Sequence, residues 1–315
     1  MKPVLAMSAC WNSSRHDDGY EMLTELAEMG FEAAELGHGI RFSLWPGVLK
    51  AQEEKIIRIQ SLHNFCPLPM GFTRASPNCY EFSDPRSNQR ARALKHSLET
   101  IDHAATLGAR AVILHLGTTQ QKNVGRRLEA LYLRGKLASR DYVKLKIQAV
   151  IDHEHWLKTQ WPWVEEILHH LIGHAAKRQV QLGLECRESI EEIPIDSAWP
   201  EILAGLPETA GYWHDFGHAA RKDALGFIDH YQHLEALAPR LIGCHIHDLI
   251  PPERDHQAPG TGRIPFAKLW PLLKKAKKEP CYVLELSPRV KKDAVVASLL
   301  WWKQNGPDAL NPVPF

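Results

Sequence analysis

Three carboxylates and one imidazole stand at regular intervals in the second half of the chain, each at the end of a short apolar run. They are Glu185 in LGLE, Asp215 in YWHD, His245 in IGCH and Glu285 in VLELS, at spacings of 30, 30 and 40 residues. If each run is a parallel strand, one strand–helix unit separates each pair, and the four side chains meet at one end of the sheet. Clustered buried charges need a partner or a cation, and mixed oxygen and nitrogen ligands suit Mn, Mg, Co or Zn. The sequence therefore predicts one divalent metal ion bound by these four residues.

The elements that must position these side chains follow an alternating pattern. Short apolar runs rich in β-formers alternate with segments that have the spacing of amphipathic helices, such as 18–29 and 87–107. The runs lie at 3–9, 31–36, 56–62, 109–116, 180–185, 211–216, 241–247 and 281–286. Eight such units predict an α/β fold, a (β/α)8 TIM barrel formed as a single domain over 1–315. An open doubly wound sheet is the alternative, but the first run is followed by CWNSSRHDDG and not by a GxGxxG turn.

Surplus length lies between the fourth and fifth runs. Residues 118–178 exceed one loop and one helix, and their pattern is helical in two stretches, so we expect a helical insertion after strand 4. Residues 122–148 contain eight Lys or Arg and only two acidic residues. Two interpretations remain open: a solvated helical hairpin, or a cap over the barrel mouth that attracts an anionic group.

Composition narrows the class of protein. Lys and Arg number 38 against 37 Asp and Glu, so no global field favours nucleic acid or anionic lipid as a partner. The six cysteines contain no CxxC pair, which argues against a disulfide scaffold or a zinc ribbon. No apolar stretch approaches the roughly 20 residues of a membrane span, and the N-terminus lacks the apolar run of a signal peptide. We therefore expect a cytoplasmic protein with no membrane partner.

The strings LGLE, DFGHA, HIHD, DHQAPGTG and LELSP, in this order, resemble the xylose isomerase-like TIM barrels. That superfamily takes in sugar isomerases, ketose 3-epimerases and endonuclease IV. The resemblance to the epimerases implies that Glu185 and Glu285, besides binding the metal, exchange protons with the substrate, and that His218 contacts the substrate. Two positions depart from the epimerase pattern: CRESIEE replaces an Asn-Arg pair, and the nearest arginine after the metal histidine is Arg254.

The resemblance to the endonuclease implies further histidines at the mouth. His63, His115, His218 and His256 match most positions of its trinuclear zinc site. Arg254 occupies the place of a ligating aspartate, and a guanidinium cannot bind a cation, which argues against a third metal. A second metal between His63, His115 and Glu185 remains open. The alternative is that these histidines donate hydrogen bonds to a substrate.

Other residues near the predicted strand ends receive narrower roles. Trp11 and Phe65 could form flat apolar walls for a sugar ring, or belong to the core. Glu35 could bind a hydroxyl or anchor a helix. His247 and Asp248 are expected to support the metal ligands through hydrogen bonds, because metal-bound imidazoles need such partners.

The function expected from this set is a metal-dependent isomerase or epimerase that acts on a small-molecule carbohydrate. The paired glutamates would move a proton next to a carbonyl, with His63, His115, His218, Arg254 and His256 binding the substrate. Two alternatives remain: a lyase that uses the same enediolate step, and a zinc phosphodiesterase similar to endonuclease IV. A homodimer is expected, because helical insertions in barrels often form subunit contacts.

Overall fold

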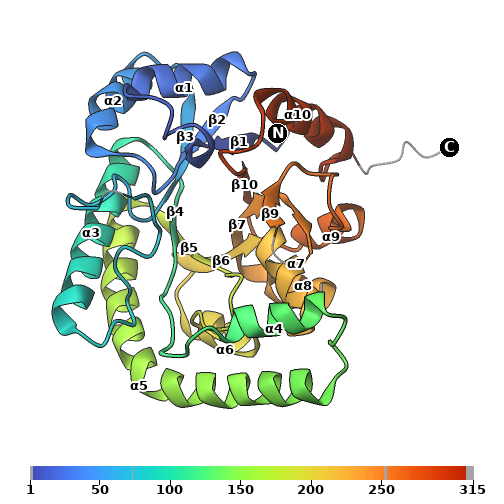
Figure 1. Cartoon of the computed structure of the whole chain (residues 1–315). Helices are drawn as coiled ribbons and strands as arrows, with labels where there is room; N and C mark the ends of the chain where they lie inside the picture. The colour runs from blue at the N-terminus through green and yellow to red at the C-terminus, as the bar shows by residue number, and fades with distance from the viewer. Residues whose placement is uncertain (1–2, 73, 252–253, 310–315) are drawn as a thin grey trace.

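Parallel strands close into an eight-membered barrel in the computed structural model, which describes residues 3–72, 74–251 and 254–309 (Figure 1). The order around the barrel is β1, β10, β7, β6, β5, β4, β3, β2. These strands are β1 Leu5–Ser8, β2 Ala33–Leu36, β3 Arg58–His63, β4 Ala111–Leu114, β5 Gln181–Glu185, β6 Ala210–Asp215, β7 Leu241–Ile246 and β10 Cys281–Leu284. The (β/α)8 barrel predicted from the sequence is confirmed, and each strand overlaps its predicted apolar run.

Helices surround the barrel and bury its outer face (Figure 1). The α-helices are α1 Gly19–Glu28, α2 Trp45–Glu53, α3 Ser87–Thr106, α4 Val124–Leu133, α5 Arg140–Arg178, α6 Trp199–Gly205, α7 Phe216–Ala224, α8 His230–Leu237, α9 Phe266–Leu273 and α10 Lys292–Asn305. Short 3-10 turns cover Ala9–Trp11, Phe42–Leu44, Asp196–Ala198 and Ala238–Arg240. The main hydrophobic core lies between strands and helices, as expected when both faces of a parallel sheet must be covered.

A tryptophan fills the centre of the barrel below the site. Trp213 of β6 is completely buried and belongs to a small inner core that is separate from the outer one. A Cβ added at Gly183 would lie 2.6 Å from its ring, and one added at Gly243 would lie 2.3 Å away. The two neighbouring strands therefore need glycine at these positions to accommodate the indole. The Trp213 ring also contacts the His245 ring edge-on, with centroids 5.2 Å apart, so it supports the floor of the mouth.

The segment 118–178, expected as an insertion, contains α4 and all of α5. Ser139 caps α5 by accepting the N–H of Tyr142, and Gln179 ends it in the left-handed conformation at φ 59°. Figure 1 shows α5 crossing one edge of the molecule and then turning to run beside α3. Pro162 lies inside α5, where a proline removes one helical hydrogen bond and favours a kink. One continuous helix thus serves both as insertion and as the barrel helix that leads into β5.

A short antiparallel hairpin interrupts the alternation after β7. Its strands are β8 Asp248–Ile250 and β9 Arg254–Gln257. Asp248 orders the following loop, because its carboxylate accepts the backbone N–H groups of Gly260, Gly262 and Ile264. Within the described residues, the helices are all too short or too polar to cross a bilayer.

Candidate metal centre at the barrel mouth

The four predicted metal ligands meet around one nitrogen atom. Glu185 and Asp215 are the last residues of β5 and β6, His245 is next to last in β7, and Glu285 follows β10 directly. His245 Nδ1 lies 3.5 Å from a Glu185 oxygen, 3.6 Å from an Asp215 oxygen and 3.3 Å from a Glu285 oxygen. All four side chains are buried. The parallel register of the barrel therefore brings together residues that are 30 to 40 positions apart.

This arrangement fits a divalent cation. His245 Nδ1 is buried and has no hydrogen-bond partner among the described residues, although three carboxylates face it. A buried polar atom left unpaired is costly, and so are three buried carboxylates gathered around one atom. A cation bound by the oxygens and by Nδ1 would relieve both problems, and the O/N donor set suits Mn, Mg, Co or Zn.

Glu35 holds the opposite side of the His245 ring. Its carboxylate oxygens lie 3.3 and 3.4 Å from His245 Nε2, and they accept hydrogen bonds from Ser8 Oγ at 3.1 Å and Ser61 Oγ at 2.8 Å. Donation of Nε2–H to Glu35 turns Nδ1 toward the three carboxylates, where it would bind a cation in place of its proton. The sequence suggested that Glu35 binds a hydroxyl or anchors a helix; the structure instead places it behind the metal-facing histidine.

Asp215 is fixed in two ways. As the N-cap of α7 it accepts the backbone N–H of His218 at 2.7 Å, and His247 Nε2 lies 2.9 Å from the same oxygen. Burial alone would raise the pKa of Asp215, but His218 and His247 hold that pKa well below its usual range. Of the two residues expected to support the ligands, His247 does so, whereas Asp248 orders the loop described above.

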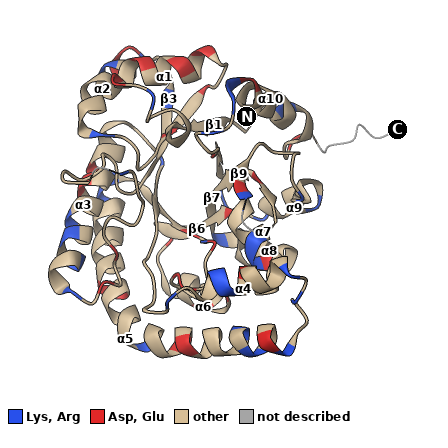
Figure 2. Cartoon of the chain, viewed as in Figure 1, with Lys and Arg blue, Asp and Glu red and all other residues tan. Residues whose placement is uncertain are grey.

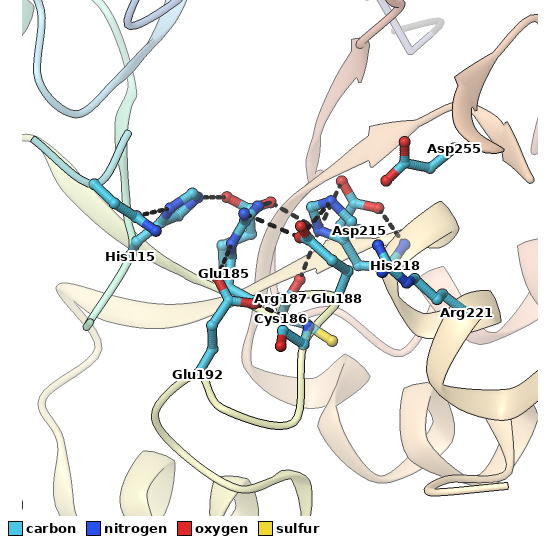
Figure 3. A network of polar contacts seen from close by, with 12 residues as sticks. His115, Glu185, Cys186, Arg187, Glu188, Glu192, Asp215, His218, Arg221 and Asp255 are labelled. Carbon is cyan, nitrogen blue, oxygen red and sulfur yellow. Dashed lines mark hydrogen bonds and ion pairs between the residues drawn. The ribbon is translucent and has the colours of Figure 1, made fainter. Parts of the chain in front are cut away.

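Glu185 lies between two histidines and an arginine (Figure 3). Its Oε2 lies 3.1 Å from His63 Nε2 and 2.6 Å from His115 Nε2, and its Oε1 lies 3.4 Å from an Arg187 nitrogen. Burial would raise the pKa of Glu185, but His115 and Arg187 hold it well below its usual range. This carboxylate is therefore ionised and strongly held.

The second nitrogen of each histidine shows how the rings are oriented. His63 Nδ1 lies 3.0 Å from the Asn64 carbonyl, and His115 Nδ1 lies 3.0 Å from Asn78 Oδ1. The Glu185 carboxylate can only accept hydrogen bonds, so Nε2 of each ring carries the proton that it donates to Glu185, and a cation bound here would take the place of that proton. Burial also lowers the pKa of His115 to about 3, which keeps that ring neutral. Together with Glu185 these rings form a second group with ligand geometry.

Arg187 and Glu188 were missed in the sequence, although both are in the CRESIEE string. Arg187 contacts Glu185, Glu188 and Glu192, the latter two at 3.0 Å, and Glu188 lies 3.2 Å from His218 Nε2 (Figure 3). Burial would lower the pKa of His218, but Asp215 and Glu188 raise it to about 9. The His218 ring is therefore a cation at neutral pH, held at the edge of the cavity.

His256 covers Glu285 from the hairpin. Its φ of 52° lies in the left-handed region, where a histidine is uncommon, and its ring stacks on His247 with centroids 4.1 Å apart. His256 Nε2 lies 3.4 Å from Glu285 Oε2, and Nδ1 lies 3.0 Å from an Asp255 oxygen. Burial would raise the pKa of Glu285, but His245 and His256 hold it well below its usual range.

A cavity of about 1040 Å³ opens above these residues. Five residues expected to bind substrate line it: His63, His115, His218, Arg254 and His256. Glu285, Cys10, His38, Arg187 and Glu188 also line it. His38 follows β2 in the string AELGH and packs edge-on against His63, with ring centroids 5.3 Å apart. Its position after a strand end was the signal that could have identified it.

Two aromatic residues expected at the mouth lie elsewhere. Trp11 is 2% exposed and donates its Nε1–H to the Val290 carbonyl, and Phe65 is 1% exposed and packs against Tyr80. Neither belongs to the described lining of the cavity. Both therefore take the alternative role considered for them, as core side chains, because aromatic residues near a strand end pack inward as readily as outward. Among the residues that the structure describes, those of segment 118–178 do not line the cavity. This favours the solvated helical hairpin over a cap on the barrel mouth.

Known proteins resemble this chain in fold and, at the level of a family, in sequence. No curated protein matches the sequence. Among solved structures, a D-tagatose 3-epimerase-like protein is 16% identical with a TM-score of 0.67, over 97% of this chain and 98% of that one. The 3-keto-D-glucoside 4-epimerase YcjR from E. coli is 16% identical with a TM-score of 0.65, over 96% and 100%. The IolI protein with a bound zinc atom is 14% identical with a TM-score of 0.64, over 98% and 100%.

These likenesses extend over the whole barrel, and at such identities they establish the fold. The sequence itself matches the family described as xylose isomerase-like TIM barrel over residues 23–305, which includes all four predicted metal ligands. With a match over most of its length, the chain belongs to the xylose isomerase-like TIM barrel family.

Proposed function

We propose that this protein is a divalent-metal-dependent isomerase or epimerase that acts on a carbohydrate next to a carbonyl group. The observation that carries the proposal is the buried, unpartnered His245 Nδ1 among Glu185, Asp215 and Glu285, below a cavity of about 1040 Å³. The fold is shared with a protein named as a sugar epimerase, with one named as epimerase-like and with one solved with zinc, which supports the assignment.

Glu185, Asp215, His245 and Glu285 would hold the metal. A bound divalent cation would polarise the substrate carbonyl and make the neighbouring C–H more acidic. The charged His218 ring and the Nε2 atoms of His63 and His115 face the same space, where they can orient the oxygens of a sugar. Positioned donors of this kind stabilise charge that develops on oxygen during proton removal.

The two glutamates are not equivalent in this site. Glu285 lines the cavity, and its Oε1 has only the Cys10 thiol nearby at 3.9 Å. Glu185 is surrounded by His63, His115 and Arg187. Glu285 is open to the cavity, where a substrate C–H can reach it, so we assign the removal of the proton to Glu285. Glu185 then serves as the partner that returns a proton or holds the second oxygen.

Isomerisation, epimerisation and elimination of water or an alcohol all begin with this proton transfer. A lyase is therefore the alternative within the same mechanism, and it differs only in whether the intermediate loses a group. Product analysis separates the two, since an isomerase conserves the mass of its substrate and a lyase does not.

A metal-dependent phosphodiesterase is a second candidate, favoured by one specific observation. Besides the four predicted ligands, Nε2 of His63 and Nε2 of His115 lie 3.1 and 2.6 Å from a Glu185 oxygen, so the mouth offers atoms for a second cation with Glu185 as the bridge. Two metals a few ångströms apart suit the hydrolysis of a phosphodiester. The near-balanced charge of the chain gives this candidate little support as a DNA-binding enzyme.

The test combines metal counting with proton exchange. Metal content by plasma mass spectrometry should be close to one ion per chain, and NMR in D2O should detect exchange of the α-proton in at least one of a panel of ketoses. Glu285→Gln should abolish the exchange, because an amide cannot accept the proton, whereas the exposed Glu53→Gln is the matched control and should leave it unchanged. Exchange that survives Glu285→Gln would refute the assigned base, and two metals with phosphodiester cleavage would favour the second candidate.

A further inference from the structure

The first half of α5 exposes a row of large aliphatic side chains. Val143 is 47% exposed, Ile147 55% and Ile151 53%. Residues four apart lie above one another on a helix, so these three form one continuous stripe, which we call the α5 stripe. Single exposed apolar residues are common on protein surfaces, but a continuous row marks a site of contact. This half of α5 lies along an outer edge of the molecule (Figure 1).

The opposite face of the same helix segment is already packed. Tyr142, Ala149 and His153 are buried there, and Tyr142 donates its hydroxyl hydrogen to the Leu225 carbonyl at 2.6 Å. His153 Nε2 lies 3.0 Å from the Glu192 carbonyl, which ties the helix to the loop after β5. These contacts fix the rotation of α5, so the α5 stripe is held facing outward.

Opposite charges flank the stripe at equal distances. Arg140 precedes Ile147 by seven residues and Glu154 follows it by seven, which is close to two helical turns in each direction. Both side chains are exposed and fall on the face of Ile147, and among the described residues neither forms an ion pair within 4.0 Å. Figure 2 shows that basic and acidic residues both occur along this half of the helix.

We propose that the α5 stripe is a homodimer interface, in which a second copy of this chain packs its own α5 in the antiparallel direction. A two-fold axis near Ile147 would pair Val143 with the partner's Ile151 and Arg140 with the partner's Glu154. Symmetry repeats each contact, so every side chain in the row finds a complementary one. The pairing is independent of the function proposed above.

The charge pattern favours a second copy over other occupants. An anionic membrane attracts a face with uniform basic charge, whereas Glu154 stands on this face at the same distance from the centre as Arg140. An unrelated partner has no reason to require equal and opposite charges at mirrored positions. The stripe is narrow compared with the roughly 1,000 Å² or more that a stable interface buries, so we expect a reversible dimer with a micromolar dissociation constant.

The experiment is sedimentation velocity on the full chain over a range of concentrations, with charge-reversal variants. The wild type should pass from monomer to dimer as concentration rises. R140E and E154R each place like charges opposite one another twice, and each should weaken dimerisation by about tenfold or more. The double reversal R140E/E154R restores the complementary pairs and should return the dissociation constant to within about threefold of wild type.

Apolar variants test the centre of the interface. I147D should abolish the dimer, whereas L300D, at a residue that is 54% exposed on α10, is the matched control and should leave it unchanged. Circular dichroism checks that each variant is folded, and recovery in the double reversal independently excludes a folding defect. A chain that stays monomeric at every concentration would overturn the proposal. So would a dimer insensitive to I147D, a double reversal that does not recover, or co-sedimentation of monomer with phosphatidylserine vesicles.

Discussion

Replacement of Glu35 by glutamine should weaken metal binding without changing any metal ligand. Glu35 is completely buried, and its two oxygens lie 3.3 and 3.4 Å from His245 Nε2. The carboxylate fixes the ring with Nδ1 toward the other carboxylates and makes that nitrogen a better donor to a cation. Glutamine keeps the shape and one oxygen acceptor but removes the negative charge.

The expected size of the effect follows from the type of hydrogen bond. A hydrogen bond to a charged group contributes about 1.5–3 kcal/mol, and one between neutral groups about 0.5–1.5 kcal/mol. The loss of about 1–1.5 kcal/mol corresponds to roughly tenfold weaker metal binding. Glu35→Ala should have a larger effect, because it also removes the acceptor for the hydroxyls of Ser8 and Ser61.

The assay is competition between the protein and a chromophoric chelator, carried out at about pH 8, where protons compete with the metal for His245 less than they do at acidic pH. Burial would lower the pKa of His245, but Glu285 and Glu35 hold it well above its usual value, and the loss of Glu35 lowers it again. At acidic pH, the lower pKa of His245 in Glu35→Gln reduces competition from protons and partly offsets the weaker metal binding. At alkaline pH this compensation is smaller. Glu32→Gln, an exposed residue just before β2, is the matched control. Equal metal affinity in Glu35→Gln and wild type would refute the orienting role of Glu35.

Two further predictions concern stability. Burial lowers the pKa of His230 to about 3, below its value of 6.5 when exposed, so the unfolded chain binds the proton more readily and the free energy of unfolding falls as pH drops below 6.5. His230 should therefore lower the free energy of unfolding by about 2 kcal/mol at pH 5. Urea titrations at about pH 7.5 and pH 5 measure this decrease. The decrease should be smaller by that amount in His230→Asn and unchanged in the exposed control His170→Asn. Gly243→Ala should lower the free energy of unfolding by about 1–3 kcal/mol, because the added Cβ would lie 2.3 Å from the Trp213 ring; denaturation as stable as wild type would contradict that packing.

The sequence was sufficient to predict the barrel, and that Glu185, Asp215, His245 and Glu285 lie together, for a physical reason. Each barrel strand is an uninterrupted buried run, and a polar residue at its end is conspicuous because charge within such a run is costly. Parallel strands of a barrel end at a common rim, so spacing along the chain translates into proximity. Glu185 and Asp215 needed no further information, since each is the last residue of its strand.

Contacts that depend on three-dimensional pairing were beyond the sequence. Glu35 and His245 are 210 residues apart, and nothing in either segment shows that β2 and β7 present these side chains to each other across the barrel. His153 is polar, which gives no reason to bury it, yet it lies buried on the same face of α5 as Ala149, with Nε2 3.0 Å from the Glu192 carbonyl of the loop after β5. Trp11 and Phe65 lie near strand ends. Whether such a side chain forms a wall of the cavity or packs in the hydrophobic core depends on the path of the loop that follows the strand.

Glu185 and Glu285 have different surroundings. This difference indicates which of them removes the proton, which the set of metal ligands alone does not. A symmetric site, with both carboxylates open to the cavity, would allow either to remove the proton. Here Glu185 is held by His63, His115 and Arg187, whereas Glu285 lines the cavity beside His256 of the hairpin. The hairpin therefore supplies a side chain beside the proposed base and none of the three groups that hold Glu185. Substrates that differ in size near the reacting carbon should then be distinguished at the hairpin and not at the metal ligands.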